Sequence, residues 1–256
     1  MSADVLIEGV AVSVDSRGVA TVMFAHPQSN SLPGALLRNL SDEITSLGAR
    51  DDVRVLVLKS AGDRAFCAGA SFDELISISD EAEGLAFFSG FAGVINALRS
   101  IPQLVIGRVQ GKAVGGGVGV ASAVDFCMAT CHASVKLSEL AVGIGPFVVG
   151  PAVERKMGVS AMSSLAIDAT TWKSADWACT HGLYAEVFDD VAALDAAVDA
   201  LAGRLAASNP DAMRELKRTF WAGTEDWDTL LLERAAVSGR LVLSDFTRQA
   251  IEAFKR

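Results

Sequence analysis

The sequence predicts an α/β core followed by a helical C-terminal part. Segments with the pattern of strands alternate with helical segments from about residue 10 to residue 129, and from about Pro151 onward nearly every segment has helical spacing. The chain has 256 residues, 51% of them hydrophobic, which is enough to bury a sizeable core. We expect a core over residues 1–190 and a helical region over residues 191–256.

The first part of the chain predicts two strands, a helix and a third strand. Residues 10–14 and 19–24 have the composition of strands, and the DSRG sequence between them predicts a hairpin turn. Ser31 is placed to cap a helix that carries Pro33 in its first turn and ends near Leu47. Residues 53–59 (VRVLVLK) are apolar nearly throughout, as expected of a strand covered on both faces.

The remaining elements continue this alternation and then become helical. The loop SAGDRAFCAGAS precedes a helix over residues 81–99, and residues 104–109 predict a strand that ends before Gly111. The segment AVGGGVGVASA then bends into a short helix, and residues 124–129 form a further strand. Ala-rich stretches near residues 190–207 and 211–222 carry apolar residues at helical spacing.

Composition and charge exclude several classes of protein. The formal net charge is −9 and the pI is about 4.8, so we expect no nucleic-acid partner, because phosphate contacts need clustered Lys and Arg. No signal peptide is recognisable, and no apolar run approaches the roughly 20 residues of a membrane span. Four cysteines without a CxxC pair predict reduced thiols and a cytoplasmic location.

Common catalytic motifs are absent from the sequence. It contains no GxGxxG, no GxxxxGK[ST], no HExxH and no GxSxG. The histidines His26, His132 and His181 lie far apart and do not have the spacing of metal ligands. We therefore expect neither a metal site nor a Ser-His-Asp triad.

Two glycine-containing loops are candidates for binding through the main chain. In residues 66–71 (FCAGAS) the small side chains let a ligand approach the backbone, although an ordinary turn has the same composition. In residues 111–119 (GKAVGGGVG) each glycine costs about 1 kcal/mol relative to Ala in a helix. Tight packing of a helix on a sheet, or a helix N-terminus whose free N–H groups bind negative charge, would compensate for that cost.

Glu139 is the candidate for proton transfer. It is an isolated acid with apolar neighbours in the segment VKLSELAVGIGP. One interpretation is a solvated carboxylate in a loop. The other is a partly desolvated carboxylate whose raised pKa suits proton transfer near neutral pH.

Together these segments resemble those of the crotonase (enoyl-CoA hydratase/isomerase) family. FCAGAS followed by FDEL is similar to the family's Phe-x-Ala-Gly-Ala pattern and the acidic, apolar helix after it. VQGKAVGGGVGVASAVDFCMAT is similar to its second oxyanion segment, including the Asp after the helix. VKLSELAVGIGP resembles its Pro-Glu-x-x-x-Gly-x-x-Pro segment, with Glu139, Gly143 and Pro146 in register. NSLPGALL and SADWACTHGLYAEVF also look like family landmarks.

The resemblance implies a fold, a substrate and an assembly. It implies a spiral of ββα units over residues 1–190 and a helical region over residues 191–256 that builds homotrimers, often paired into hexamers. The substrate would be an acyl-CoA thioester, so coenzyme A arrives with the substrate and no separate cofactor is expected. The amides of Ala70 and Gly116 would hold the thioester carbonyl, and Glu139 would move the proton. The resemblance places the coenzyme A portion along Ala68, Gly69, Gly115 and Gly117, with the adenine beside Ala68.

The chain also departs from the family pattern. Many family hydratases have a first glutamate where this chain has Gly119. Before Glu139 this chain has Ser138 in place of the family's usual Pro. After Pro146 it has Phe147, Val148 and Val149, where Gly-rich residues are common in hydratases with two glutamates. A single glutamate permits an enoyl-CoA hydratase similar to the methylglutaconyl-CoA type, which we favour. It also permits a Δ3,Δ2-enoyl-CoA isomerase. A non-catalytic relative that only binds acyl-CoA is the alternative from another class.

The acyl group cannot be identified from these residues. A second carboxylate on the substrate would need a nearby Arg or Lys, which the sequence does not single out. Phe87, Phe88, Phe91 and Phe147 either line an acyl pocket or belong to the core. If Glu139 is not the acid, Asp73 and Glu74 are the next candidates.

Overall fold

Two sheets lie at the centre of the molecule, in a computed structural model that describes residues 7–254. The larger sheet has the strand order β1-β2-β3-β5-β7-β9, and the smaller has the order β4-β6-β8. The first two strands pair antiparallel, and every other pair is parallel. The strands are β1 (Gly9–Val14), β2 (Val19–Ala25), β3 (Val55–Ser60), β4 (Ala65–Cys67), β5 (Leu104–Val109), β6 (Lys112–Val114), β7 (Phe126–Thr130), β8 (Val135–Lys136) and β9 (Glu186–Phe188).

The chain repeats a ββα unit as it moves along these sheets. Each of the pairs β3–β4, β5–β6 and β7–β8 gives one strand to the larger sheet and the next to the smaller sheet, and helices follow each pair. These helices are α2 (Phe72–Ser77) and α3 (Glu81–Ser100), then α4 (Gly116–Ala123), then η1 (Leu140–Val142) and α5 (Gly150–Ile167). The predicted spiral of ββα units is confirmed.

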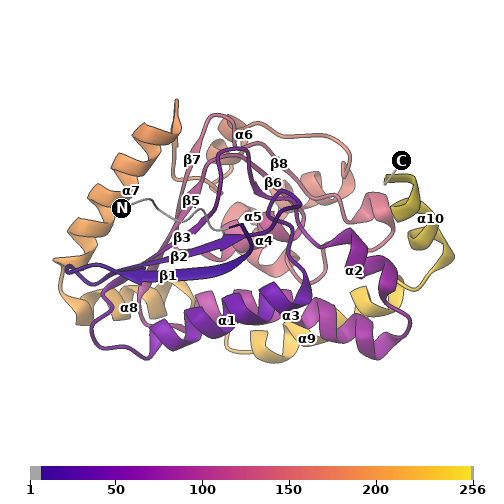
Figure 1. The fold of residues 1–256 in the computed structure, drawn as a ribbon, viewed down its shortest axis with the longest axis horizontal. Coiled ribbons are helices and arrows are strands. Elements are labelled where there is room, and N and C mark those ends of the chain that lie inside the picture. The colour runs from indigo at the N-terminus through magenta and orange to yellow at the C-terminus, as the bar shows by residue number, and fades with distance from the viewer. Residues whose placement is uncertain (1–6, 255–256) are drawn as a thin grey trace.

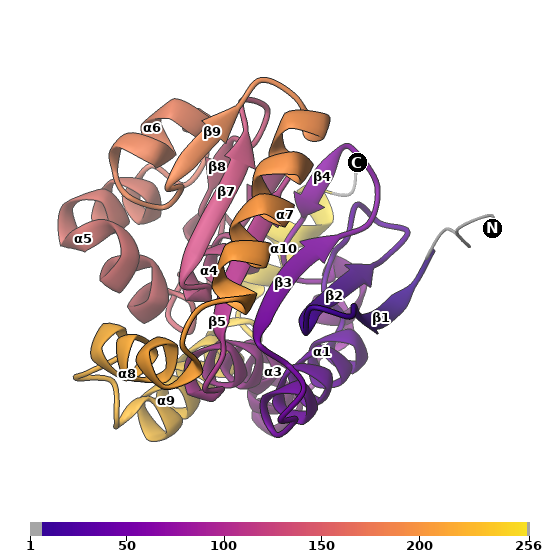
Figure 2. The same cartoon turned by 90° about the vertical axis from the view of Figure 1, so that its left-hand side faces the viewer.

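Helices cover both faces of the larger sheet. Leu56 and Leu58 of β3 pack with α1 (Gly34–Gly48), whereas Val55 and Val57 pack with α7 (Val191–Ala206). Figure 1 shows α1, α3 and α9 (Trp227–Leu241) on one side of the strands, and Figure 2 shows α7 lying across the other. Coverage on both faces explains why residues 55–58 of this strand are all apolar.

The C-terminal region is helical, as predicted. After α6 (Ala175–Thr180) and α7 come α8 (Pro210–Phe220), α9 and α10 (Asp245–Phe254). Helix α9 lies directly on α3 where two glycines meet, because a Cβ atom on Gly84 would be 2.6 Å from the carbonyl oxygen of Gly239. A trimer or hexamer formed through this region stays a prediction.

Several local expectations were wrong. Ser31 does not cap α1: the cap position is Pro33, and the Ser31 hydroxyl contacts Nδ1 of His26 at 2.8 Å. Strands β4, β6 and β8 were not predicted, because two or three residues are too few to show alternation. Strand β9 interrupts a part of the chain that was expected to be helical, since it joins the edge of the larger sheet beside β7.

A buried ion pair fixes α8 to the core. Asp125, directly after α4, accepts hydrogen bonds from Nζ of Lys217 (2.7 Å), Nε1 of Trp221 (2.7 Å) and the amide of Val105 (2.7 Å). The side chains of Asp125 and Lys217 are each 4% exposed. Burial lowers the pKa of Lys217, while the neighbouring carboxylate favours its charged form. Asp125 is therefore the shared partner of Lys217, Trp221 and Val105, and Lys217 donates a further hydrogen bond to the carbonyl of Leu98 (2.7 Å).

We expect Asp125→Ala to lower the free energy of unfolding by about 3–5 kcal/mol, because Lys217 would remain buried without its counter-charge. Urea unfolding at fixed protein concentration measures the change. The control is Glu215→Ala on the same helix, which removes an exposed pair with Arg218 and should change the free energy of unfolding by about 0–1 kcal/mol. Equal effects of the two substitutions would contradict the prediction.

Candidate active site

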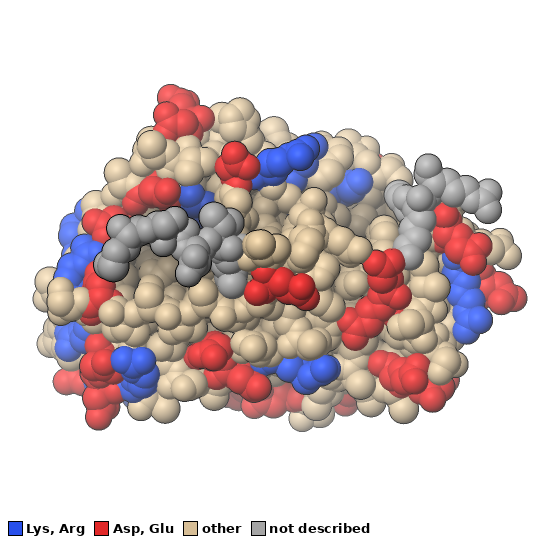
Figure 3. Space-filling model, in the orientation of Figure 1, with Lys and Arg blue, Asp and Glu red and all other residues tan. Residues whose placement is uncertain are grey.

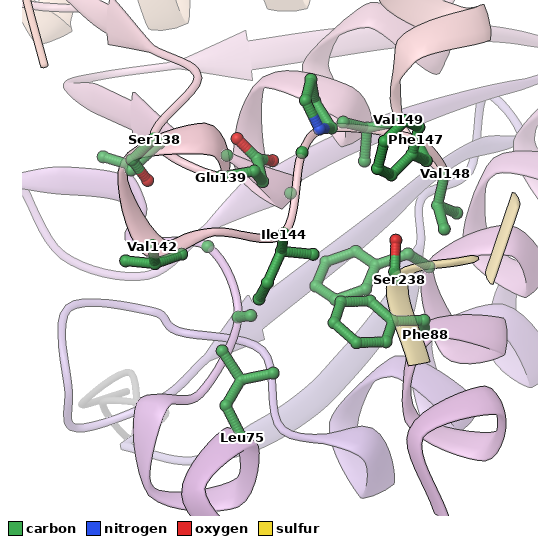
Figure 4. Close-up of a pocket in the computed structure, with 18 of the residues that line it drawn as sticks. Leu75, Phe88, Ser138, Glu139, Val142, Ile144, Phe147, Val148, Val149 and Ser238 are labelled. Atoms are coloured by element: carbon green, nitrogen blue, oxygen red, sulfur yellow. The ribbon is translucent and has the colours of Figure 1, made fainter. Parts of the chain in front are cut away.

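One cavity brings together the three segments singled out in the sequence. It has a volume of about 50 Å³ and is lined by Ala70, Gly116 and Glu139, among others. Its other walls come from α3, α9 and the segment that follows η1, as Figure 4 shows. Among the residues that the structure describes, Ser138, Glu139 and Ser238 are the only ones that contribute polar side chains to the lining.

The first loop leaves one amide free. Ala68 donates its amide to the carbonyl of Ser29 (3.1 Å), and the carbonyl of Gly69 accepts from Leu32 (2.7 Å). Gly69 has a φ of 89°, which favours glycine, and a Cβ there would lie 2.9 Å from the carbonyl oxygen of Val114. Within residues 7–254 the amide of Ala70 donates to no other protein group. It is therefore available to a ligand in the cavity.

A strained turn supports this loop, and the sequence analysis did not identify it. Ser29 and Asn30 have φ values of 56° and 57°, in the left-handed region. The side-chain amide of Asn30 donates to the carbonyls of Ala61 (2.9 Å) and Ala65 (3.0 Å). Asn30 thereby holds the start of β4, which leads into Ala70. The sequence feature that could have predicted this turn is the Asn itself, because Asn adopts the left-handed conformation more readily than most residues.

The second loop ends at the N-terminus of α4. Gly115 donates its amide to the carbonyl of Lys136 (2.8 Å), and its φ is 51°. Gly116 is the first residue of the helix, and its amide makes no hydrogen bond within the described part of the chain. A Cβ atom on Gly69 would lie only 3.6 Å from the Gly116 nitrogen, so the two loops are adjacent.

Close packing explains the glycines of this run, and binding of negative charge at the helix N-terminus stays a prediction. A Cβ on Gly116 would overlap the ring of Phe91, and one on Gly117 would lie 2.7 Å from Cβ of Cys67. The helix therefore packs too tightly for side chains at these positions. Its N-terminus also presents free N–H groups to the cavity, where the helix dipole favours negative charge. Gly117 lies behind the cavity and does not line it.

The carboxylate of Glu139 is desolvated. Its main-chain carbonyl accepts from Val142 (3.2 Å) and Ile144 (2.9 Å), which fixes the turn around η1. A Cβ on Gly115 would lie 3.0 Å from Oε1, so the carboxylate rests on the glycine backbone. The residue as a whole is partly exposed, but Oε2 is sealed from solvent and has no hydrogen-bond partner among the described residues. Burial raises the pKa of Glu139 to about 7.

The position of the missing first glutamate is filled by another side chain. A Cβ atom on Gly119 would lie 2.5 Å from Cβ of Val149 and would also overlap Cγ1. Val149 is buried and lines the cavity. A side chain at position 119 would therefore have to displace Val149.

The remaining candidate residues divide into those that line the cavity and those that do not. Phe88, Phe91 and Phe147 line the cavity, whereas Phe87 belongs to the core and stacks edge-to-face on Phe88 at 5.2 Å. Asp73 and Glu74 do not line it. Glu74 accepts the amide of Gly34 at 2.6 Å, at the start of α1.

Within the described part of the chain, no Lys, Arg or His side chain lines this cavity. Residues 7–254 also contain no group of three or more side chains able to hold a metal ion. In the same part of the chain no helix is long and apolar enough to cross a membrane. Figure 3 shows acidic and basic side chains interspersed on one face, with no continuous basic surface there.

A sequence model described as enoyl-CoA hydratase/isomerase matches residues 15–250. The chain therefore belongs to this family, the crotonase superfamily.

Relatives and solved structures agree with this assignment. The chain is 27% identical to the short-chain-enoyl-CoA hydratase of Clostridium acetobutylicum, over 92% of this chain and 90% of the relative. It is 30% identical to the human mitochondrial methylglutaconyl-CoA hydratase over 200 residues, which cover 77% of this chain and 58% of that protein. A structure of a putative enoyl-CoA hydratase from Mycobacterium avium paratuberculosis superimposes with a TM-score of 0.84 at 25% identity, over 96% of each chain. The chain spans little more than half the length of several curated relatives.

We expect Glu139→Gln to stabilise the protein above neutral pH. The folded-state pKa of about 7 exceeds the ordinary value of 4.5, so between these values the unfolded chain binds fewer protons, and stability falls as pH rises. The amide cannot ionise, and at pH 8 the variant should gain up to about 3 kcal/mol over the wild type. The gain should vanish near pH 4.

Denaturant unfolding across this pH range measures the difference. Glu154→Gln on the exposed face of α5 serves as the control and should show no such pH-dependent gain. A Glu139→Gln curve parallel to the wild type at every pH would contradict the prediction.

We expect Gly119→Glu and Val149→Gly to be energetically coupled. Gly119→Glu alone should lower the free energy of unfolding by about 1–3 kcal/mol, because the new side chain overlaps Val149. In the Val149→Gly background the same change should cost less. A double-mutant cycle measures the coupling, and additivity within about 0.5 kcal/mol would show that Val149 does not exclude the acid.

Proposed function

We propose that this chain is an enoyl-CoA hydratase, which adds water across the double bond of an α,β-unsaturated acyl-CoA. The observation that carries the proposal is the meeting of the Glu139 carboxylate with the amides of Ala70 and Gly116 in one cavity. The names of the human and clostridial relatives support a hydratase. Coenzyme A would enter as part of the substrate, and we propose no separate cofactor.

The two amides would form an oxyanion hole. Addition of hydroxide at the β-carbon moves negative charge to the thioester oxygen. Two main-chain donors, with Gly116 at the N-terminus of α4, are suited to stabilise that charge where it develops. Loss of one such donor typically costs about 3–4 kcal/mol of transition-state stabilisation.

Glu139 would act first as the base and then as the acid. Its carboxylate takes a proton from water, and the resulting hydroxide forms the C–O bond at the β-carbon. The protonated carboxyl then gives the proton to the α-carbon, so one water is consumed and the double bond is lost. A pKa of about 7 suits both steps, because the protonated and ionised forms are similarly populated at neutral pH.

The rest of the molecule would serve the coenzyme A portion and the assembly. Ala68, Gly69 and Gly115 line the cavity and leave the main chain open to the substrate, and Gly117 packs behind them. We propose that the adenine lies along Ala68. We further propose a cytoplasmic homotrimer or hexamer, assembled through the C-terminal helices.

A Δ3,Δ2-enoyl-CoA isomerase is the second candidate, and the glycine at position 119, where an acid would have to displace Val149, favours it. In that reaction Glu139 removes a proton from the α-carbon and returns it to the γ-carbon, and no water is needed. The same oxyanion hole serves the intermediate. The two reactions differ in whether solvent oxygen enters the product.

The deciding experiment is turnover in heavy-oxygen water with crotonyl-CoA and with its 3-enoyl isomer. We expect the product from crotonyl-CoA to carry heavy oxygen at its β-carbon. Glu139→Gln should reduce the rate about 10²- to 10⁴-fold, because the amide cannot accept the proton, and Glu154→Gln should remain active.

Two other outcomes would overturn the proposal. Migration of the double bond without oxygen incorporation would identify the isomerase. Binding of both thioesters without turnover would identify an acyl-CoA-binding protein without catalysis.

A further inference from the structure

Ser238 places a single hydroxyl in the apolar part of the cavity. Ser238 lies on α9, is 1% exposed and lines the same cavity as Ala70 and Gly116. Figure 4 shows its hydroxyl directed away from α9, on the side where Phe147 and Val148 lie, with Phe88 close by.

This hydroxyl has no partner in the protein. Other helical hydroxyls in the chain donate to the carbonyl four residues earlier, as Ser122 does to Val118 (2.8 Å) and Thr219 to Glu215 (2.8 Å). Ser238 makes no such bond, and within residues 7–254 no hydrogen bond involves its side chain. Its oxygen is not among the sealed, unpaired polar atoms of the described residues, so it opens to the cavity. A ligand that displaces water from this hydroxyl must offer it a hydrogen-bonding atom, or the hydroxyl is left unpaired at a cost.

The lining limits the chemistry of that ligand atom. Among residues 7–254, Glu139 is the only ionisable side chain in the cavity lining, and no Lys, Arg or His of these residues lines it. A carboxylate at the far end of an acyl chain would be buried without a counter-charge and near another acid, which is unfavourable. A neutral hydroxyl or keto oxygen carries no such cost and can pair with the serine hydroxyl.

The size of the cavity limits the acyl chain. Its volume of about 50 Å³ accommodates about three to five groups of the size of a water molecule. Phe88, Phe91 and Phe147 are bulky members of its apolar lining. The cavity therefore suits a chain of a few carbons.

We propose that Ser238 is a specificity-determining residue that hydrogen-bonds a neutral hydroxyl or keto oxygen at the distal end of a short acyl chain. This inference rests on the proposed function, because an acyl-CoA must occupy the cavity. It identifies the substrate class as short, terminally oxygenated and uncharged acyl thioesters.

The test is calorimetric binding of three saturated thioesters, which cannot be hydrated: butyryl-CoA, 4-hydroxybutyryl-CoA and succinyl-CoA. We expect the full chain to bind 4-hydroxybutyryl-CoA about 3- to 10-fold more tightly than butyryl-CoA, the range of one neutral hydrogen bond. Succinyl-CoA should bind more weakly than either.

Two variants and a control test whether the Ser238 hydroxyl causes the preference for 4-hydroxybutyryl-CoA over butyryl-CoA. Ser238→Ala removes it, and Ser238→Cys keeps the volume with a weak donor, so both should bind the two neutral thioesters equally. Ser122→Ala removes another buried helical hydroxyl outside the cavity and should keep the wild-type preference.

An equal preference in the wild type and in Ser238→Ala would overturn the inference and leave the proposed function intact. Tightest binding of succinyl-CoA would overturn the assignment of an uncharged group. Failure of all three thioesters to bind would overturn the proposed function and this inference with it.

Discussion

The site depends on a close approach of main chain to main chain that leaves no room for side chains. The loops at Gly69 and Gly115 touch each other, and Gly116 and Gly117 press against Phe91 and Cys67. Because these positions lack Cβ atoms, two amides and one carboxylate can meet in a small volume. The same approach removes water from the carboxylate of Glu139, and this desolvation raises its pKa toward neutrality.

The ββα spiral explains how segments distant in sequence reach one place. Strands β4, β6 and β8 are neighbours in the smaller sheet, so the loops after them emerge side by side. The loop after β4 carries Ala70, the loop after β6 carries Gly116, and the turn after β8 carries Glu139. Each functional group is therefore contributed by one turn of the spiral at the same edge of the same sheet.

The sequence predicted the long strands and the long helices well, because their patterns are local. The strand over residues 104–109 has the predicted bounds, and α3 ends one residue later than expected. Capping at Ser31 was wrong because the hydroxyl contacts His26 instead. The short strands of the smaller sheet were missed because their pairing, and not their composition, defines them.

The candidate site was predictable only in part, for a similar reason. Glycine runs and an isolated acid are visible in the sequence. Val149 looks like any residue of an apolar segment, and Ser238 looks like any polar residue of a helix. Their importance comes from contacts across the fold, between Val149 and Gly119 and between Ser238 and the cavity. Such contacts have no local signature.

The placement of α9 in the cavity wall has a consequence for biosynthesis. Translation produces the loops with Ala70, Gly116 and Glu139 well before residues 227–241, which form α9 and carry Ser238. Until residues 227–241 have been synthesised, the apolar wall around Phe88 and Phe147 lacks this covering helix. The cavity is therefore completed by a segment that is made long after the loops that carry Ala70 and Gly116.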